Sequence, residues 1–158
     1  VKRGFATAIA NNYLQSKSPV LSEMAQLVRS LAAGKLEDLC NQLTAFFASI
    51  PYTMRRKEDE RERERYFHYT FYLIFRLMST YTVLSEKQQS EGRADCIIET
   101  PCSVYIFEFK LDGTAEEALS QIEEKGYARP YSNDRRKLYK VGASFSSKTG
   151  TIEDWEVK

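Results

Sequence analysis

Hydrophobic positions in the first third of the chain recur at helical spacing. In LSEMAQLVRSLAAGK, residues 21–35, the apolar side chains follow an i, i+3, i+4, i+7 pattern, and Gly34 is placed to end the helix. These positions are Met24, Leu27, Val28 and Leu31. Residues 35–51 repeat the pattern until Pro51 closes it. The sequence therefore predicts two short amphipathic helices in a hairpin, which we interpret as packing elements.

The next segment, RRKEDERERERYFHYTFYLIFRLMS at 55–79, changes from charged to apolar. Alternating charges are typical of a solvated helical face, whereas the apolar residues 66–78 predict a buried central helix. One face of this helix, followed back from Met78 through Phe75, Phe71 and His68, reaches Glu64. Taken alone, Glu64 is more typical of a solvated surface position than of a site.

Strand and helix patterns alternate in the rest of the chain. Strands are predicted near 81–87, 93–99, 103–110, 137–145 and 151–157. A helix is predicted over 115–125, because Thr114 and Glu117 form the sequence of a capping box and Gly126 follows the last apolar position. The order predicts an α/β fold with a mixed central sheet flanked by the 66–78 and 115–125 helices.

Three charged residues interrupt an otherwise apolar hairpin, GRADCIIETPCSVYIFEFK at 92–110. Because strand side chains alternate, Glu108 and Lys110 share one face, and Asp95 on the neighbouring strand is expected beside Glu108. Adjacent carboxylates repel each other unless a cation such as Mg²⁺ lies between them, and Lys110 could then orient a water. Spacing alone leaves two interpretations open, a metal site and a salt-bridged cluster, of which the cluster is the more common.

Composition limits the partners. The chain has 158 residues and a formal net charge of +1, so nucleic acid could bind only through a local basic patch. Three cysteines without a CxxC pair and a single histidine argue against zinc and predict reduced thiols in a cytoplasmic protein. No apolar run approaches the ~20 residues that span a bilayer. Because the sequence opens at Val1, we expect it to be a piece of a longer protein.

The combined motifs GRAD…ETP…VYIFEFKLDGTAEEALSQIEEKGYARPY resemble the PD-(D/E)XK nuclease domain found C-terminal to AAA-ATPase-like regions in bacterial proteins. The likeness extends from IPY at 50–52, through ERYFHYTFYLIFRLMS, to VGASFSSKTGTIEDWEVK at the end. It implies a restriction-endonuclease-like domain at 51–158, preceded at 1–50 by a helical linker from the ATPase-like region. Ala94 replaces the proline of the superfamily's name, which removes no ligand.

The resemblance also implies roles for single residues. Asp95 and Glu108 would be metal ligands, with Glu64 completing the metal shell, and Lys110 would be the catalytic lysine. Gln121 would flank them in the catalytic site. The cationic residues nearest to this site, which we expect to contact nucleic acid, are Arg93, Lys125 and Arg129, with RRK at 135–137 further along.

The expected function is Mg²⁺-dependent hydrolysis of phosphodiester bonds, with Mn²⁺ as a substitute metal and DNA preferred to RNA as the substrate. The alternative is a catalytically silent nuclease fold that serves regulation or protein interaction for the attached ATPase-like domain. A homodimer is a further candidate assembly. Nucleotide binding within this chain is disfavoured, because the sequence has no G-x-x-x-x-G-K-[ST] loop.

Overall fold

The computed structural model describes residues 20–49, 70, 74 and 94–158. The chain divides into two compact units, Val1–Thr82 with Thr149–Thr151, and Val83–Lys148 with Ile152–Lys158. Each unit is described by itself. None of the described helices is long and apolar enough to cross a bilayer.

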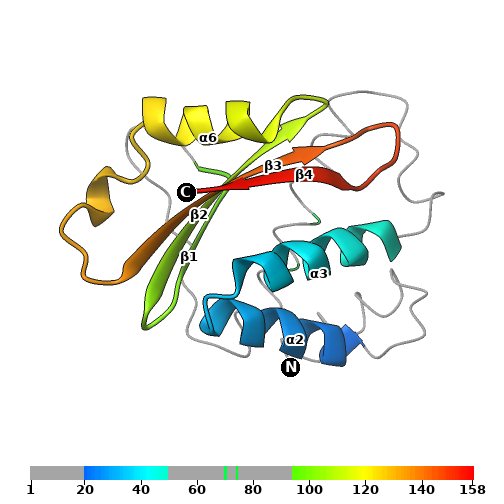
Figure 1. Ribbon diagram of the computed structural model, residues 1–158, viewed down its shortest axis with the longest axis horizontal. Coiled ribbons are helices and arrows are strands. Elements are labelled where there is room, and N and C mark those ends of the chain that lie inside the picture. The colour runs from blue at the N-terminus through cyan, green and yellow to red at the C-terminus, as the bar shows by residue number, and fades with distance from the viewer. Residues whose placement is uncertain (1–19, 50–69, 71–73, 75–93) are drawn as a thin grey trace. The chain divides into compact units, whose positions relative to one another are not determined.

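The described helices of the first unit are α2 (Val20–Ala32) and α3 (Leu36–Ser49), which pack against each other as the predicted hairpin (Figure 1). Gly34 ends α2 with φ of 67°, and Lys35 N–H donates to the Ser30 carbonyl at 2.9 Å. The buried apolar side chains lie on the predicted faces: Met24, Leu27, Leu31, Leu39, Cys40, Leu43, Phe46 and Phe47. The helical hairpin is therefore confirmed.

The second unit is built on a four-stranded sheet with the order β1-β2-β3-β4 (Figure 1). Its strands are β1 (Cys96–Glu99), β2 (Ser103–Leu111), β3 (Lys137–Phe145) and β4 (Ile152–Val157). β2 pairs with β3 in parallel, whereas β1 and β4 pair antiparallel to their neighbours. The mixed sheet is confirmed. The predicted 81–87 strand lies outside the described residues, as does the 66–78 helix apart from Thr70 and Ile74, which are both helical.

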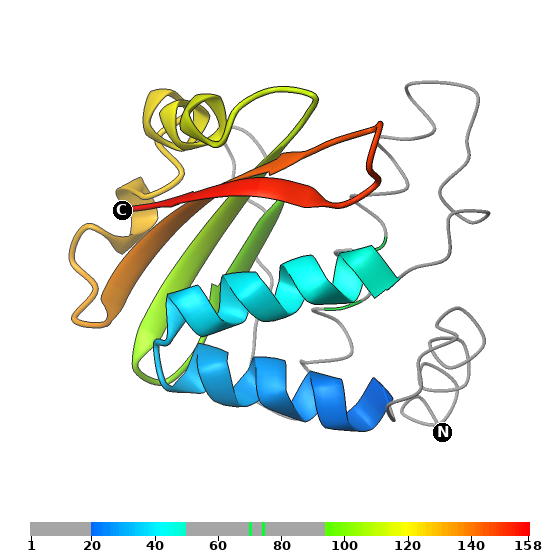
Figure 2. The same cartoon turned by 45° about the vertical axis from the view of Figure 1, so that its right-hand side comes forward.

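Helix α6 (Ala115–Glu124) makes the crossover between the parallel strands β2 and β3 and packs on both of them (Figures 1 and 2). The predicted capping box is present: Glu117 N–H donates to Thr114 Oγ1 at 3.0 Å, and Thr114 N–H donates to Glu117 Oε2 at 2.9 Å. The close approach of α6 to β3 depends on Gly142, because a Cβ at that position would lie 2.2 Å from the Ala115 carbonyl oxygen.

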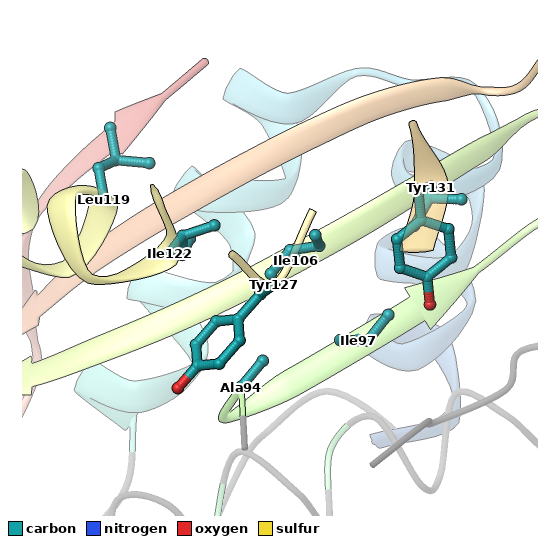
Figure 3. Close-up of a cluster of buried hydrophobic side chains, with 8 residues drawn as sticks. Ala94, Ile97, Ile106, Leu119, Ile122, Tyr127 and Tyr131 are labelled. Atoms are coloured by element: carbon teal, nitrogen blue, oxygen red, sulfur yellow. The ribbon is translucent and has the colours of Figure 1, made fainter. Parts of the chain in front are cut away.

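The two faces of β2 carry different side chains. Val104 and Ile106 lie in a buried cluster with Leu119 and Ile122 of α6 (Figure 3). The alternate positions carry aromatic residues, which form a row on the opposite face of the strand. The ring centroids of Tyr105 and Phe107 in this row are 6.4 Å apart. The predicted alternation is thus confirmed, and it directs Glu108 and Lys110 to the face that α6 covers.

An ion-pair network fixes the far end of β1 to the connection that follows α6. Arg136 donates to Glu99 at 2.7 Å and to Asp134 at 2.6 Å, and its Nη1 donates to the Thr100 carbonyl at 3.2 Å. Tyr131 adds its hydroxyl, which donates to Glu99 Oε1 at 3.4 Å. These contacts offset the cost of placing the Glu99 carboxylate in the sheet.

Candidate active site

Asp95 and Glu108 meet where the pairing of β1 with β2 stops. β1 begins at Cys96, so the predicted strand start at 93 is wrong for the described residues 94 and 95, and Asp95 lies in a bend just before the strand. The reason is that hydrogen bonds from side chains replace the backbone hydrogen bonds between β1 and β2 at this point. Asp95 Oδ2 accepts the Phe109 N–H at 2.9 Å, and Glu108 Oε2 accepts the Asp95 N–H at 3.3 Å. The expected neighbourhood of the two acids is therefore present.

Glu108 is the more unusual of these carboxyls, because only 3% of its surface is exposed. Burial and then the negative charge of Asp95 raise the pKa of Glu108 to about 8. The Asp95 N–H, the Lys110 charge and the Gln121 side chain act in the opposite direction without restoring the ordinary value. A buried carboxyl beside a second acid favours either a proton or a cation at this position.

Gln121 joins the sheet residues to α6. Lys110 Nζ donates to Gln121 Oε1, and Gln121 Nε2 donates to Glu108 Oε1. The capping box and the close packing at Gly142 set the start of α6, and they thereby place Gln121 two turns later over the end of β2. Four predicted site residues are brought together in this way: Asp95, Glu108, Lys110 and Gln121.

The other predicted site residues are not part of this arrangement as described. Glu64 and Arg93 lie outside the described residues. Lys125 is exposed at the C-cap of α6. Arg129 is also exposed, at the start of the short 3-10 helix η1 (Arg129–Tyr131), and its side chain lies against Gly126. Contact of these basic residues with nucleic acid stays a prediction.

Two of the basic side chains of the RRK segment at 135–137 already contact other residues of the chain. Arg136 is engaged by Glu99 and Asp134, and its side chain is 25% exposed. Lys137 lies over the Tyr139 ring, with Nζ 4.6 Å from the centroid. Arg136 therefore serves the structure of the sheet end.

Tyr127 is a residue that sequence reasoning missed. It is 3% exposed, and burial, followed by the negative charges of Glu108 and Asp95, raises the pKa of its hydroxyl above the ordinary value. One sequence pattern could have predicted that Tyr127 is buried. Tyr127 directly follows Gly126, and the residue after a glycine that ends a helix often packs back on that helix.

An open groove runs along α6 beside the site. Lys110 and Gln121 form part of its lining, and Glu116, Glu117 and Glu124 make the rest of it strongly acidic. Phosphate groups are repelled by such a surface. The groove is therefore a poor path for a nucleic-acid backbone.

The donor atoms of the site suit a hard divalent cation. Within the described residues, no group of three or more His, Cys, Asp or Glu side chains could hold a metal, so Asp95 and Glu108 are a pair of neighbouring carboxyls there. Mg²⁺ commonly binds through one or two carboxylates and keeps several waters. A cation between these acids would also remove the repulsion that raises the pKa of Glu108. The residues present fit such an ion.

Comparison with known proteins places the chain in a family. Residues 62–155 match the family model of the PD-(D/E)XK nuclease superfamily. The whole chain is 31% identical over 160 residues to a protein of Azotobacter chroococcum mcd 1 described as "Uncharacterized protein in vnfD 5'region". The chain spans 31% of the length of that relative. No solved structure matches the chain.

Members of this superfamily generally use divalent metals. The mixed sheet and the α6 crossover also agree with the restriction-endonuclease-like α/β fold of the superfamily. On the family match over residues 62–155, the chain belongs to the PD-(D/E)XK nuclease superfamily.

Proposed function

We propose that this protein is a Mg²⁺-dependent nuclease that hydrolyses phosphodiester bonds through Asp95, Glu108 and Lys110. The observation that carries the proposal is the Glu108 carboxyl. It is buried, adjoins Asp95 and has a pKa raised to about 8. A structural carboxylate in a sheet is normally neutralised as Glu99 is, by an arginine at 2.7 Å.

Asp95 and Glu108 would hold the metal. A bound divalent cation supplies Lewis acidity, which lowers the pKa of water and offsets charge on the phosphodiester. The two acids are positioned for this by the chain itself. Asp95 is fixed by the Phe109 N–H, and Glu108 by the Asp95 N–H and by Gln121. Glu64 stays a proposed third ligand.

Lys110 would contribute positive charge beside the carboxylates. Its Nζ donates to Gln121 Oε1, and Gln121 in turn donates to Glu108. Gln121 thus bridges the Lys110 ammonium and the Glu108 carboxyl, and it keeps the ammonium near the acids. An ammonium there can orient the attacking water or stabilise charge on the phosphoryl oxygens.

We propose DNA as the first substrate to test and RNA as the second. Arg93, Lys125 and Arg129 are the proposed contacts to the phosphate backbone, because the total charge of +1 requires a local patch. The division into a 1–50 linker and a 51–158 nuclease domain, and an attached ATPase-like region, belong to the same proposal.

Metal binding and cleavage test the proposal together. The wild type should melt at a higher temperature in Mg²⁺ or Mn²⁺ than in EDTA, and it should cut supercoiled plasmid or labelled RNA only with metal. Asp95→Ala should lose both effects, whereas Glu116→Gln, which removes an exposed carboxylate of α6, should keep both. A wild type that neither gains thermal stability from metal nor cuts either substrate would favour the silent interaction module.

A further inference from the structure

The connections that follow β2 and β3 leave the same end of the sheet, because these two strands are parallel (Figures 1 and 2). Lys110 of the candidate site lies opposite Ser144 in the register of the two strands. In open α/β sheets, ligands commonly bind outside the carboxyl ends of the strands. The connection after β3 therefore lies where a ligand of the candidate site would extend.

Hydrogen bonds hold these two connections together. Asp112 N–H donates to the Phe145 carbonyl at 2.7 Å, and Ser147 N–H donates to Asp112 Oδ1 at 2.8 Å. Ser144 adds its hydroxyl, which donates to the Gly113 carbonyl at 2.7 Å. Asp112 has φ of 56°, a conformation that aspartate and asparagine adopt more readily than most residues. The turn that contains Ser147 is thus fixed to the connection that leaves the candidate site.

Lys148 follows Ser147 on this anchored turn. It is exposed and forms no ion pair with any described residue, so its charge is available to a ligand. The Asp112 carboxylate on the neighbouring connection accepts the Ser147 N–H and is not ion-paired with Lys148. The groove that runs along α6 from Lys110 is lined by glutamates instead, and it repels phosphates. Within the described residues, a phosphate beside Lys110 is therefore attracted toward Lys148 and repelled from α6.

We propose that Lys148 binds a backbone phosphate of the substrate strand, beside the phosphodiester that the candidate site cleaves, and that Asp112 is the positioning residue that holds its turn. This inference rests on the proposed nuclease function and deepens it, because it says on which side of Lys110 the strand lies. A contact to a backbone phosphate carries no sequence information. Lys148 therefore adds affinity for DNA of any sequence and takes no part in the chemical step.

Equilibrium binding of a fluorescent DNA duplex in EDTA measures this contact without cleavage. At about 50 mM salt, Lys148→Gln should weaken binding about 10-fold, and it should lower the slope of log Kd against log salt by about 0.9, the value for one phosphate contact. Lys148→Arg keeps the charge and should bind like the wild type. The matched control is Lys158→Gln, which removes an exposed lysine charge beyond the other end of β4 and should also bind like the wild type.

Asp112→Asn and Asp112→Ala test the positioning role with the same change of charge. Asparagine can still accept the Ser147 N–H and tolerates the positive φ, whereas alanine can do neither. Asp112→Ala should therefore bind the duplex several-fold more weakly than Asp112→Asn. Equal affinities of these two variants would overturn the positioning role of Asp112.

Binding in EDTA and plasmid cleavage in Mg²⁺ together separate this inference from the proposed function. If Lys148→Gln binds with the affinity and salt slope of the wild type, the phosphate contact is overturned, and cleavage by the wild type would still support the nuclease. If binding depends on Lys148 but the wild type does not cleave, the contact is supported and the nuclease is refuted. A wild type that does not bind the duplex at all would overturn the contact.

Discussion

Replacing Glu108 by glutamine should stabilise the metal-free protein above neutral pH. The folded state raises the pKa of this carboxyl from 4.5 to about 8. A raised pKa means that the folded state binds the proton more tightly than the unfolded state. The contribution of Glu108 to stability is therefore fully present below pH 4.5, and it is lost as the pH rises to about 8. A glutamine at this position has no carboxyl proton to lose, so its contribution should be independent of pH.

The size of the effect follows from the same shift. A rise from 4.5 to about 8 corresponds to at most about 5 kcal/mol, at about 1.4 kcal/mol per pH unit. Part of this gain is lost, because Glu108 accepts N–H bonds on both oxygens and a glutamine NH₂ would face one of those donors. Such a mismatch costs about 1–3 kcal/mol. We expect a net gain of about 2 kcal/mol or more at pH 8 and none at pH 4.5.

Urea unfolding in EDTA at a series of pH values measures this directly. Trp155 is the only tryptophan of the chain and lies on β4, so its fluorescence reports on the unit that contains Glu108. The matched control is Glu99→Gln, which weakens an ion pair with Arg136 and should destabilise the protein at pH 8. If Glu108→Gln is destabilised at pH 8 as Glu99→Gln is, the buried and repelled state of Glu108 is refuted.

Three further predictions concern other parts of the unit. Lys110→Ala should fold normally by circular dichroism and abolish Mg²⁺-dependent cleavage; residual activity near the wild-type rate would exclude Lys110 from catalysis. Gly142→Ala should cost about 1–3 kcal/mol or more in unfolding by Trp155 fluorescence, because the added Cβ meets the Ala115 carbonyl at 2.2 Å. Arg136→Met should cost about 1–3 kcal/mol, and less in a Glu99→Gln background; equal losses in both backgrounds would contradict the ion pair.

The side chains that share one face of β2 could be predicted from the sequence, because strand side chains alternate between the two faces. Val104 and Ile106 pack under α6, and Glu108 follows them on the same face. The limits of α6 were also local, since a capping box and a glycine with positive φ define them. Local patterns of this kind do not require knowledge of distant contacts.

Features that depend on distant partners were harder to predict. Asp95 lies outside β1 because its carboxylate takes an N–H from β2, which no strand pattern records. Arg136 resembled a basic patch until its partner Glu99, 37 positions away, was known. Tyr127 was missed because its place in the site depends on how the end of α6 turns. Glu64 and Arg93 stay predictions, since both lie outside the described residues.

The most direct test of the central claim is the rate at which the 158-residue chain cuts supercoiled plasmid DNA in Mg²⁺, compared with Glu108→Gln at equal folded concentration. The account predicts metal-dependent cleavage by the wild type, none in EDTA, and a loss of about 100-fold or more in Glu108→Gln. Cleavage that continues in EDTA, or that Glu108→Gln retains at the wild-type rate, would contradict a nuclease site at Asp95 and Glu108.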